Sequence, residues 1–124
     1  MKTTWVLGLV AMTGVALTSL ATRTGGSPVA PDPRAAVFLR HGCNDCHAIY
    51  AFRMKALHDV GPDLSYAYTN VPTRYGVDLE TFLDRPTGMM RLMLESQIRL
   101  SPVDRDSIVQ TLKGLYAQRV ALGR

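Results

Sequence analysis

The sequence predicts an all-α domain. Two helix starts, each followed by apolar residues on one face, support this prediction. Asp32 precedes Pro33 and Ser101 precedes Pro102, so each segment starts with a capping residue before a proline at the first helical position. Apolar residues then recur at helical spacing, which predicts one buried face per helix. These faces comprise Ala35, Phe38, Leu39 and Gly42 in the first helix, and Ile108, Leu112, Leu115 and Arg119 in the last.

A third, shorter helix is expected over residues 78–83. Its inward positions would be Leu79, Phe82 and Leu83. Pro86 ends this segment, because a proline disfavours helical backbone in the residue before it. A chain of 124 residues holds one domain, and its core is modest at this size. We expect that domain to span residues 32–124.

The N-terminus predicts export. Lys2 is followed by an uncharged run over residues 3–22, with Ser19 and Ala21 at the small-residue positions of a cleavage site. Residues 1–21 are therefore a signal peptide, or an uncleaved membrane anchor, since the run approaches the roughly 20 residues that span a bilayer. Lys2 on the cytoplasmic side places the domain on the periplasmic side of the membrane in either case. Residues 22–31 are rich in Gly, Pro, Ser and Thr and form a flexible linker.

The chemistry of the chain centres on residues 43–47, Cys-Asn-Asp-Cys-His. Two thiols three residues apart, with a histidine directly after them, are the attachment signature of c-type haem. Cys43 and Cys46 can each add to a haem vinyl group, and His47 can offer its imidazole to the iron. A thioredoxin-like pair would need a βαβ setting, which is missing here. A structural zinc site would need four suitably spaced ligands, and the chain has two cysteines in all.

Residues 32–116 resemble the small monohaem cytochromes c of the mitochondrial type. The resemblance rests on the Cys-x-x-Cys-His motif, on Gly-Pro-Asp-Leu at residues 61–64, and on residues 86–90 before the final helix. It implies a cytochrome c fold of three to five short helices around one covalently bound haem, with the first and last helices crossing beside it. The apolar residues 48–52 are then expected to line the haem.

The resemblance also assigns roles to single residues. Pro62 would accept a hydrogen bond from the imidazole of His47 through its carbonyl, and Leu64 would touch the porphyrin. Arg74 and Tyr75 are the expected partners of the haem propionates, because a guanidinium pairs well with a carboxylate. No tryptophan lies beyond the leader to share that role, unlike in many relatives.

The sixth ligand is expected to be a methionine in an irregular loop after Pro86. Met90 matches the family's Pro-x-x-x-Met arrangement, while Met89 and Met93 compete with it. Gly88 can adopt backbone angles closed to other residues and would help shape the loop. Many relatives carry proline directly after the ligand, where this chain has Arg91.

Electron transfer is the function that this ligand set implies, and no enzyme activity or small-molecule substrate is expected. The formal charge of +4 is too small to indicate nucleic acid, and is compatible with redox protein partners that have acidic docking surfaces. An anchored subunit of a respiratory or photosynthetic complex is the alternative. A haem enzyme or gas sensor, and ligation by a second histidine such as His41 or His58, are further possibilities.

Overall fold

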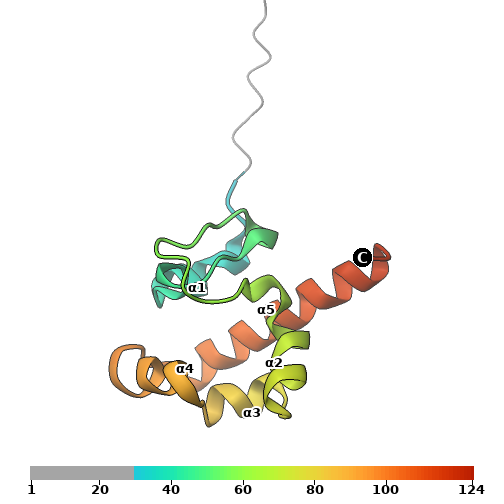
Figure 1. Cartoon of the computed structure of the whole chain (residues 1–124). Helices are drawn as coiled ribbons and strands as arrows, with labels where there is room; N and C mark the ends of the chain where they lie inside the picture. Colours follow the sequence, from blue (N-terminus) through green and yellow to red (C-terminus); the bar gives the residue numbers. More distant parts are fainter. Residues whose placement is uncertain (1–29) are drawn as a thin grey trace, which may run out of the picture.

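The computed structural model describes residues 30–124, and helices make up most of this part of the chain (Figure 1). The predicted signal peptide or anchor and nearly all of the linker lie outside the described residues. The only β feature among the described residues is an isolated bridge between Ile49 and Met54. The all-α prediction is therefore confirmed for this part of the chain. The α-helices are α1 (Ala36–Arg40), α2 (Ala67–Tyr75), α3 (Leu79–Asp84), α4 (Gly88–Leu92) and α5 (Pro102–Ala121).

Single helical turns complete the framework. Four are 3-10 turns, η1 (Pro33–Ala35), η2 (Cys43–Asp45), η3 (Tyr50–Phe52) and η4 (Leu64–Tyr66), and η5 (Met93–Gln97) is a π-helical turn. None of the helices among residues 30–124 combines the length and the apolar character of a membrane span.

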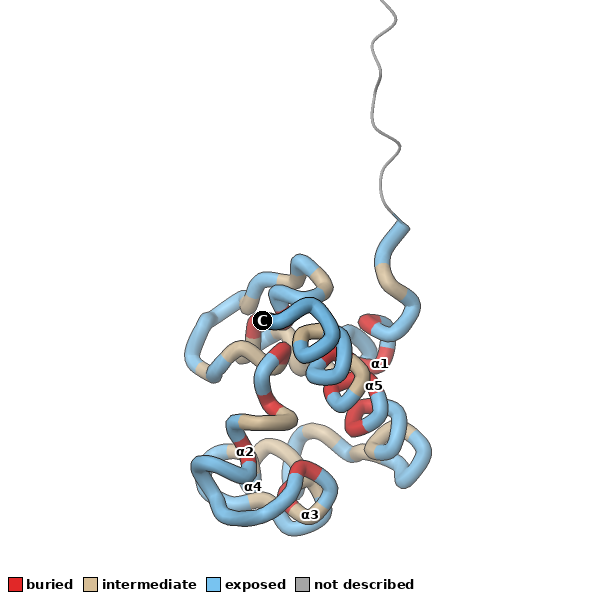
Figure 2. Tube along the Cα trace, turned by 90° about the vertical axis from the view of Figure 1, so that its right-hand side faces the viewer, coloured by how far each residue is buried: buried red, intermediate tan, exposed pale blue. Residues whose placement is uncertain are grey.

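Helix α5 packs against α1, α2 and α3, and in Figure 1 it runs diagonally between α1 on one side and α2 and α3 on the other. It begins as predicted, because the backbone N–H of Asp104 donates to Ser101 Oγ at 3.1 Å. Its inner face is buried and carries Ile108, Val109, Thr111, Leu112 and Leu115. Figure 2 shows the buried residues concentrated where α1, α2 and α3 face this helix.

The first helix also begins where the sequence predicts, but its buried face differs. Asp32 accepts a hydrogen bond from the backbone N–H of Arg34 at 2.9 Å, and Phe38 is fully buried. Leu39, expected in the core, is 52% exposed, and Val37 is buried instead. The first turn is a 3-10 turn with three residues per turn, which rotates the following residues relative to an ideal α-helix.

An ionic cluster joins the end of α1 to the start of α5. Asp104 Oδ1 lies 2.5 Å from Arg40 Nη2, and its Oδ2 lies 3.1 Å from His41 Nε2. Hydrogen bonds from Ser101, then from Arg40 and His41, hold the pKa of the Asp104 carboxyl below its usual range. His41 thus contacts Asp104 at the junction between α1 and α5.

No helix was specifically predicted over residues 67–75, where the structure has α2 with Pro72 inside it. Pro72 removes one backbone hydrogen bond from the last turn of α2, and the helix ends after this turn at Gly76 with φ +70°. Helix α3 follows as predicted: Asp78 caps it by accepting from Thr81 N–H at 2.6 Å, and Leu79 and Phe82 are buried.

The segment after Pro86 is helical, which corrects the expected irregular loop. Gly88 has the anticipated left-handed backbone, with φ +59°, and starts α4. The π-helical turn η5 continues directly from α4, and the backbone becomes extended at Ile98. Met90 and Met93 therefore lie about one helical turn apart on a continuous coil.

Candidate functional site

The Cys-x-x-Cys-His segment forms a compact turn directly after α1. Gly42 reverses the chain with φ +66°, and η2 then begins at Cys43. A backbone hydrogen bond from His47 N–H to Cys43 O, 3.0 Å long, closes the segment. Both cysteines are half-buried and neither forms a disulfide. The local fold thus presents two free thiols and an imidazole from one turn of backbone.

Residues 57–64 are fastened alongside this turn by a series of backbone hydrogen bonds. The N–H groups of Leu57, His58, Gly61 and Leu64 donate to the carbonyls of Asn44, Asp45, Cys46 and Ala48, at 2.9, 3.0, 2.8 and 2.8 Å respectively. Asp63 anchors the end of the loop, since its Oδ1 accepts from the N–H of both Tyr50 and Ser65. This pairing holds Gly61 and Pro62 against His47.

The imidazole of His47 is oriented by Pro62. Its Nδ1 lies 2.8 Å from the carbonyl oxygen of Pro62, the hydrogen bond that the sequence resemblance implies. A carbonyl oxygen only accepts, so Nδ1 carries the proton and Nε2 keeps a free lone pair in the neutral ring. Such a second partner fixes the ring and raises the basicity of the nitrogen that faces a metal. His47 is thereby prepared to act as a metal ligand through Nε2.

Gly61 makes room for the ring. A Cβ at this position would overlap Cε1 and Nδ1 of His47 and lie 2.9 Å from Nε2. Only a residue without a side chain allows the backbone to pass this close to the imidazole. The glycine in the Gly-Pro-Asp-Leu segment is therefore part of the site, although its φ is unremarkable.

Two adjoining cavities meet at His47 and Met90. The narrower, of about 80 Å³, is almost wholly apolar and contains both cysteines and Leu64 in its lining. The wider, of about 430 Å³, is lined by Pro62, Arg74 and Tyr75 among others. Its volume alone falls within the roughly 300–1,000 Å³ typical of ligand and cofactor sites.

The Cys-x-x-Cys-His residues, Met90 and the four residues to which the resemblance gives haem-binding roles each line at least one of these two cavities. Cys43, Cys46 and Leu64 lie along the narrow one, and Pro62, Arg74 and Tyr75 along the wide one. Arg74 and Tyr75 are exposed at the mouth, where the Tyr75 ring stacks on Phe82 with 4.7 Å between centroids. The guanidinium of Arg74 forms no ion pair with another described residue.

The three methionines are placed differently. Met90 lines both cavities and packs against the core, whereas Met93 lines only the narrow cavity. Met89 is 68% exposed and lines neither. Because they lie one helical turn apart, Met90 and Met93 both turn toward the cysteines, and Met89 turns away. The geometry therefore favours Met90 as the sulfur that faces His47.

One expectation for neighbouring residues is not met, and the alternative of a second histidine ligand finds no support. Residues 48–52 do not line either cavity: Ile49 is buried against the core instead, and Tyr50 is exposed. The isolated bridge to Met54 reverses the chain here and turns these side chains away from the site. His41 and His58 also lie outside both cavities, so neither is placed as a second histidine ligand.

Burial sets the protonation state of one thiol. It raises the pKa of Cys43 to about 11, chiefly through desolvation of the thiolate. Cys43 is thus a neutral thiol at physiological pH, unlike the acidic thiol of a disulfide oxidoreductase. No group of three or more His, Cys, Asp and Glu side chains among residues 30–124 is arranged to hold a metal ion.

Sequence reasoning missed Leu94, Ile98 and Leu100, which line the narrow cavity beside Leu83, a residue that was predicted to face inward. Ile98 and Leu100 alternate with polar neighbours, a weak signal of extended backbone with one side inward. Three residues are too few to distinguish that pattern from chance.

The donor set fits a covalently attached haem. The two free thiols, the imidazole with Nε2 unprotonated and the thioether of Met90 converge on cavities with mainly apolar walls, and Gly61 leaves space beside the ring. No protein-family model, curated protein or solved structure matches the chain. The functional argument therefore rests on the residues and their geometry.

Proposed function

We propose that this protein is a monohaem cytochrome c of the mitochondrial type that transfers single electrons between redox partners. The observation that carries the proposal is the placement of Cys43, Cys46 and His47 around cavities that Met90 also lines. A bound c-type haem would supply the one-electron centre. The polypeptide holds that group, selects its ligands and limits the access of water.

Each residue of the site has a distinct role in this proposal. Cys43 and Cys46 attach the haem when each S–H adds across a vinyl double bond. His47 ligates through Nε2, and Pro62 fixes its orientation through the 2.8 Å hydrogen bond. Met90 would provide a thioether sulfur to the iron, and this ligand type would favour the reduced state and raise the potential relative to a second histidine. Leu64 contributes apolar wall, and Arg74 and Tyr75 serve the propionates at the open mouth.

Electron transfer is favoured over gas sensing or catalysis by the ligand arrangement. If His47 and Met90 both ligated the iron, they would leave no coordination position for a substrate or gas. Neither His41 nor His58 reaches the cavities to compete. Burial among apolar side chains also disfavours the additional charge of the oxidised centre.

We further propose that the domain works on the periplasmic side of a bacterial inner membrane. The uncharged run over residues 3–22 supports export, with the run either cleaved or retained as an anchor in a respiratory or photosynthetic complex. Redox proteins with acidic surfaces are the proposed partners, in line with the formal charge of +4. Intact-mass measurement of the purified protein distinguishes the soluble form from the anchored one.

The proposal is tested by expressing the full chain in a bacterium with haem-attachment machinery. We expect haem to stay with the polypeptide through acid–acetone extraction and denaturing gels. A redox titration should follow a one-electron curve, and the reduced protein should not bind carbon monoxide. His58→Ala should leave all three results unchanged. His47→Ala should abolish the retention of haem and the one-electron titration. Loss of haem from the wild type on extraction, or tight carbon monoxide binding, would contradict the proposal.

A further inference from the structure

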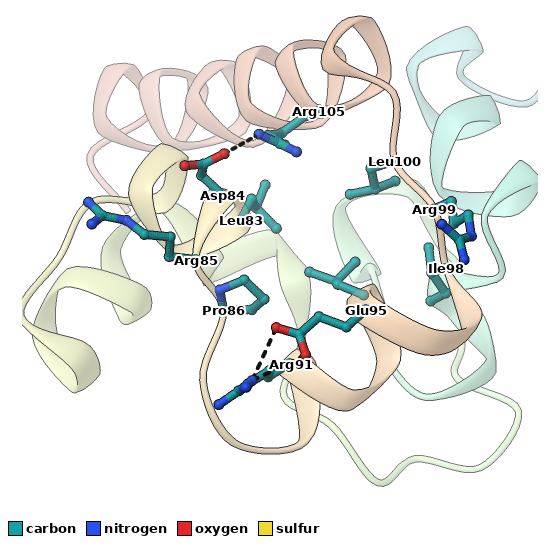
Figure 3. Close-up of a pocket in the computed structure, with 11 residues that line it drawn as sticks. Leu83, Asp84, Arg85, Pro86, Arg91, Glu95, Ile98, Arg99, Leu100 and Arg105 are labelled. Atoms are coloured by element: carbon teal, nitrogen blue, oxygen red, sulfur yellow. Dashed lines mark hydrogen bonds and ion pairs between the residues drawn. The ribbon is translucent and has the colours of Figure 1, made fainter.

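A third cavity lies behind the proposed haem site and is lined by arginines (Figure 3). It encloses about 480 Å³ between the end of α3, the α4–η5 coil and the first turn of α5. Four arginines and two carboxylates line it, so the lining carries a net charge of +2. The arginines are Arg85, Arg91, Arg99 and Arg105.

Half of these guanidinium groups are neutralised within the chain. Arg105 Nη1 lies 2.6 Å from Asp84 Oδ1, and Arg91 Nε lies 3.1 Å from Glu95 Oε1. Arg85 and Arg99, on opposite sides of the opening in Figure 3, form no ion pair with another described residue. Arg105 Nε is buried and has no hydrogen-bond partner among the described residues. The cavity therefore has one buried N–H donor without an acceptor and two guanidinium groups without a counter-charge among the described residues.

The floor of the cavity is apolar. Leu83, Leu94, Ile98 and Leu100 line it and also line the narrow cavity that contains Cys43 and His47. A single layer of side chains therefore separates the arginine-lined cavity from the proposed haem site. The cavity offers an apolar surface below and guanidinium groups around the rim, within the volume range of small-ligand sites.

We propose that this cavity binds a small organic anion that carries two acidic groups, carboxylates or phosphates, on a short carbon body. Two negative charges match the net charge of the lining, and guanidinium groups bind planar or tetrahedral oxyanions through paired N–H donors. The enclosed volume and the apolar floor favour a small molecule over a flat protein surface.

Calorimetry on the haem-loaded full chain, at low ionic strength, tests the proposal with succinate and 3-phosphoglycerate as probes, since each carries two acidic groups on a short carbon body. We expect saturable binding of at least one probe that Arg99→Gln weakens about tenfold, the effect of losing one charge-assisted contact. Lys113→Gln removes the same charge from an exposed position of α5 outside this cavity and should leave the affinity unchanged. Arg99 is exposed and unpaired in this part of the chain, so its replacement does not threaten folding.

Three outcomes would overturn the proposal. These are no saturable binding of either probe, equal weakening by Arg99→Gln and Lys113→Gln, and binding of a glutamate-rich peptide but of neither small anion. The last would identify the cavity as a contact for an acidic protein.

A second measurement connects the cavity to the haem site and rests on the proposed function. An anion held one side-chain layer away should stabilise the more positive oxidised haem and lower its reduction potential. We expect saturating succinate to shift the potential of the wild type downward and that of Arg99→Gln less. Binding with an unchanged potential would overturn this coupling alone, whereas absence of haem from the protein would contradict the proposed function and leave the calorimetry to decide on the anion.

Discussion

At the scale of single residues, the site depends on how His47 is held. Its ring is fixed on one side by the carbonyl of Pro62 and on the other by the bare backbone of Gly61. These contacts come from a loop about fifteen residues downstream, so the imidazole is oriented before any ligand binds. Preorganisation of this kind lowers the cost of forming an iron–nitrogen bond.

Gly61→Ala should disturb this arrangement sterically. The added methyl group overlaps the His47 ring, so the loop or the imidazole must shift and the bond to Pro62 is strained or lost. We expect a loss of about 1–3 kcal/mol in the free energy of unfolding, typical of overpacking. Urea denaturation followed by circular dichroism measures it.

Gly114→Ala is the control for this substitution. A Cβ at Gly114 meets nothing within 4 Å, and the residue lies inside α5. Alanine should therefore stabilise the protein there by roughly 0.5–1 kcal/mol. If both substitutions had the same effect, close contact at His47 would not explain the glycine at position 61.

Replacing each candidate methionine by leucine identifies the sixth ligand. Leucine keeps the volume and removes the sulfur, at a packing cost under about 1.5 kcal/mol. We expect Met90→Leu to convert the haem to high spin and lower its potential, while Met89→Leu and Met93→Leu leave both properties unchanged. Visible spectroscopy and redox titration provide the measurements. If only Met93→Leu changed the spin state and the potential, the sixth ligand would be Met93, one helical turn further along the α4–η5 coil.

At the scale of elements, the junction of α1 and α5 depends on one carboxylate. Asp104 accepts from the Ser101 hydroxyl and contacts Arg40 and His41 at the end of α1. It thus serves both as part of the α5 cap and as the ionic link between the first and last helices. The two helices bury Phe38 and Leu112 behind that link.

Asp104→Asn should reduce stability in a pH-dependent manner. The folded-state pKa of Asp104 is lowered from 3.8, so the charge contributes stability that is fully present above about pH 4 and is lost as the pH falls through the folded value. We expect the variant to unfold at lower urea concentration than the wild type at pH 7, and the difference to disappear at pH 2.

Asp106→Asn is the matched control, since Asp106 is exposed on the same turn of α5 and forms no ion pair with a described residue. Its urea midpoint should stay close to that of the wild type at both pH values. If Asp104→Asn lowered the urea midpoint equally at both pH values, the shape of the side chain rather than its charge would stabilise the junction of α1 and α5.

At the scale of the whole molecule, stability depends on a small core around α5. The largest fully buried side chains are Phe38, Ile49 and Leu112, from three segments distant in sequence. A domain of this size buries limited apolar surface, so each core residue contributes a large share of the total. The helices therefore depend on one another for stability.

Leu112→Ala should be strongly destabilising. Leu112 is 2% exposed, and truncation of a buried leucine costs about 2–5 kcal/mol through lost contacts and the cavity left behind. Leu122→Ala, at a position 70% exposed near the end of α5, should stay within about 0.5 kcal/mol of the wild type. Thermal and urea unfolding of both variants measure the difference, and similar losses would contradict the assignment of the core.

The sequence by itself determined the features that depend on short-range chemistry. The capping residues Asp32, Asp78 and Ser101 begin helices where they were predicted, because each accepts from a backbone N–H only two or three residues away. The Cys-x-x-Cys-His turn is likewise local, whereas the bond between His47 and Pro62, fifteen residues apart, was implied only by the family resemblance. Local hydrogen bonds and fixed spacing leave little for the rest of the chain to alter.

Only the tertiary structure decided the features that depend on packing between distant segments. It turned Leu39 outward and Val37 inward, kept Pro72 within α2, made the segment around Met90 helical and moved residues 48–52 away from the site. It also gathered four arginines around one cavity, from α4, from α5 and from the segments that follow α3 and η5. Each outcome balances burial against backbone geometry over many residues at once, and such a balance is set by the whole fold rather than by any stretch of sequence.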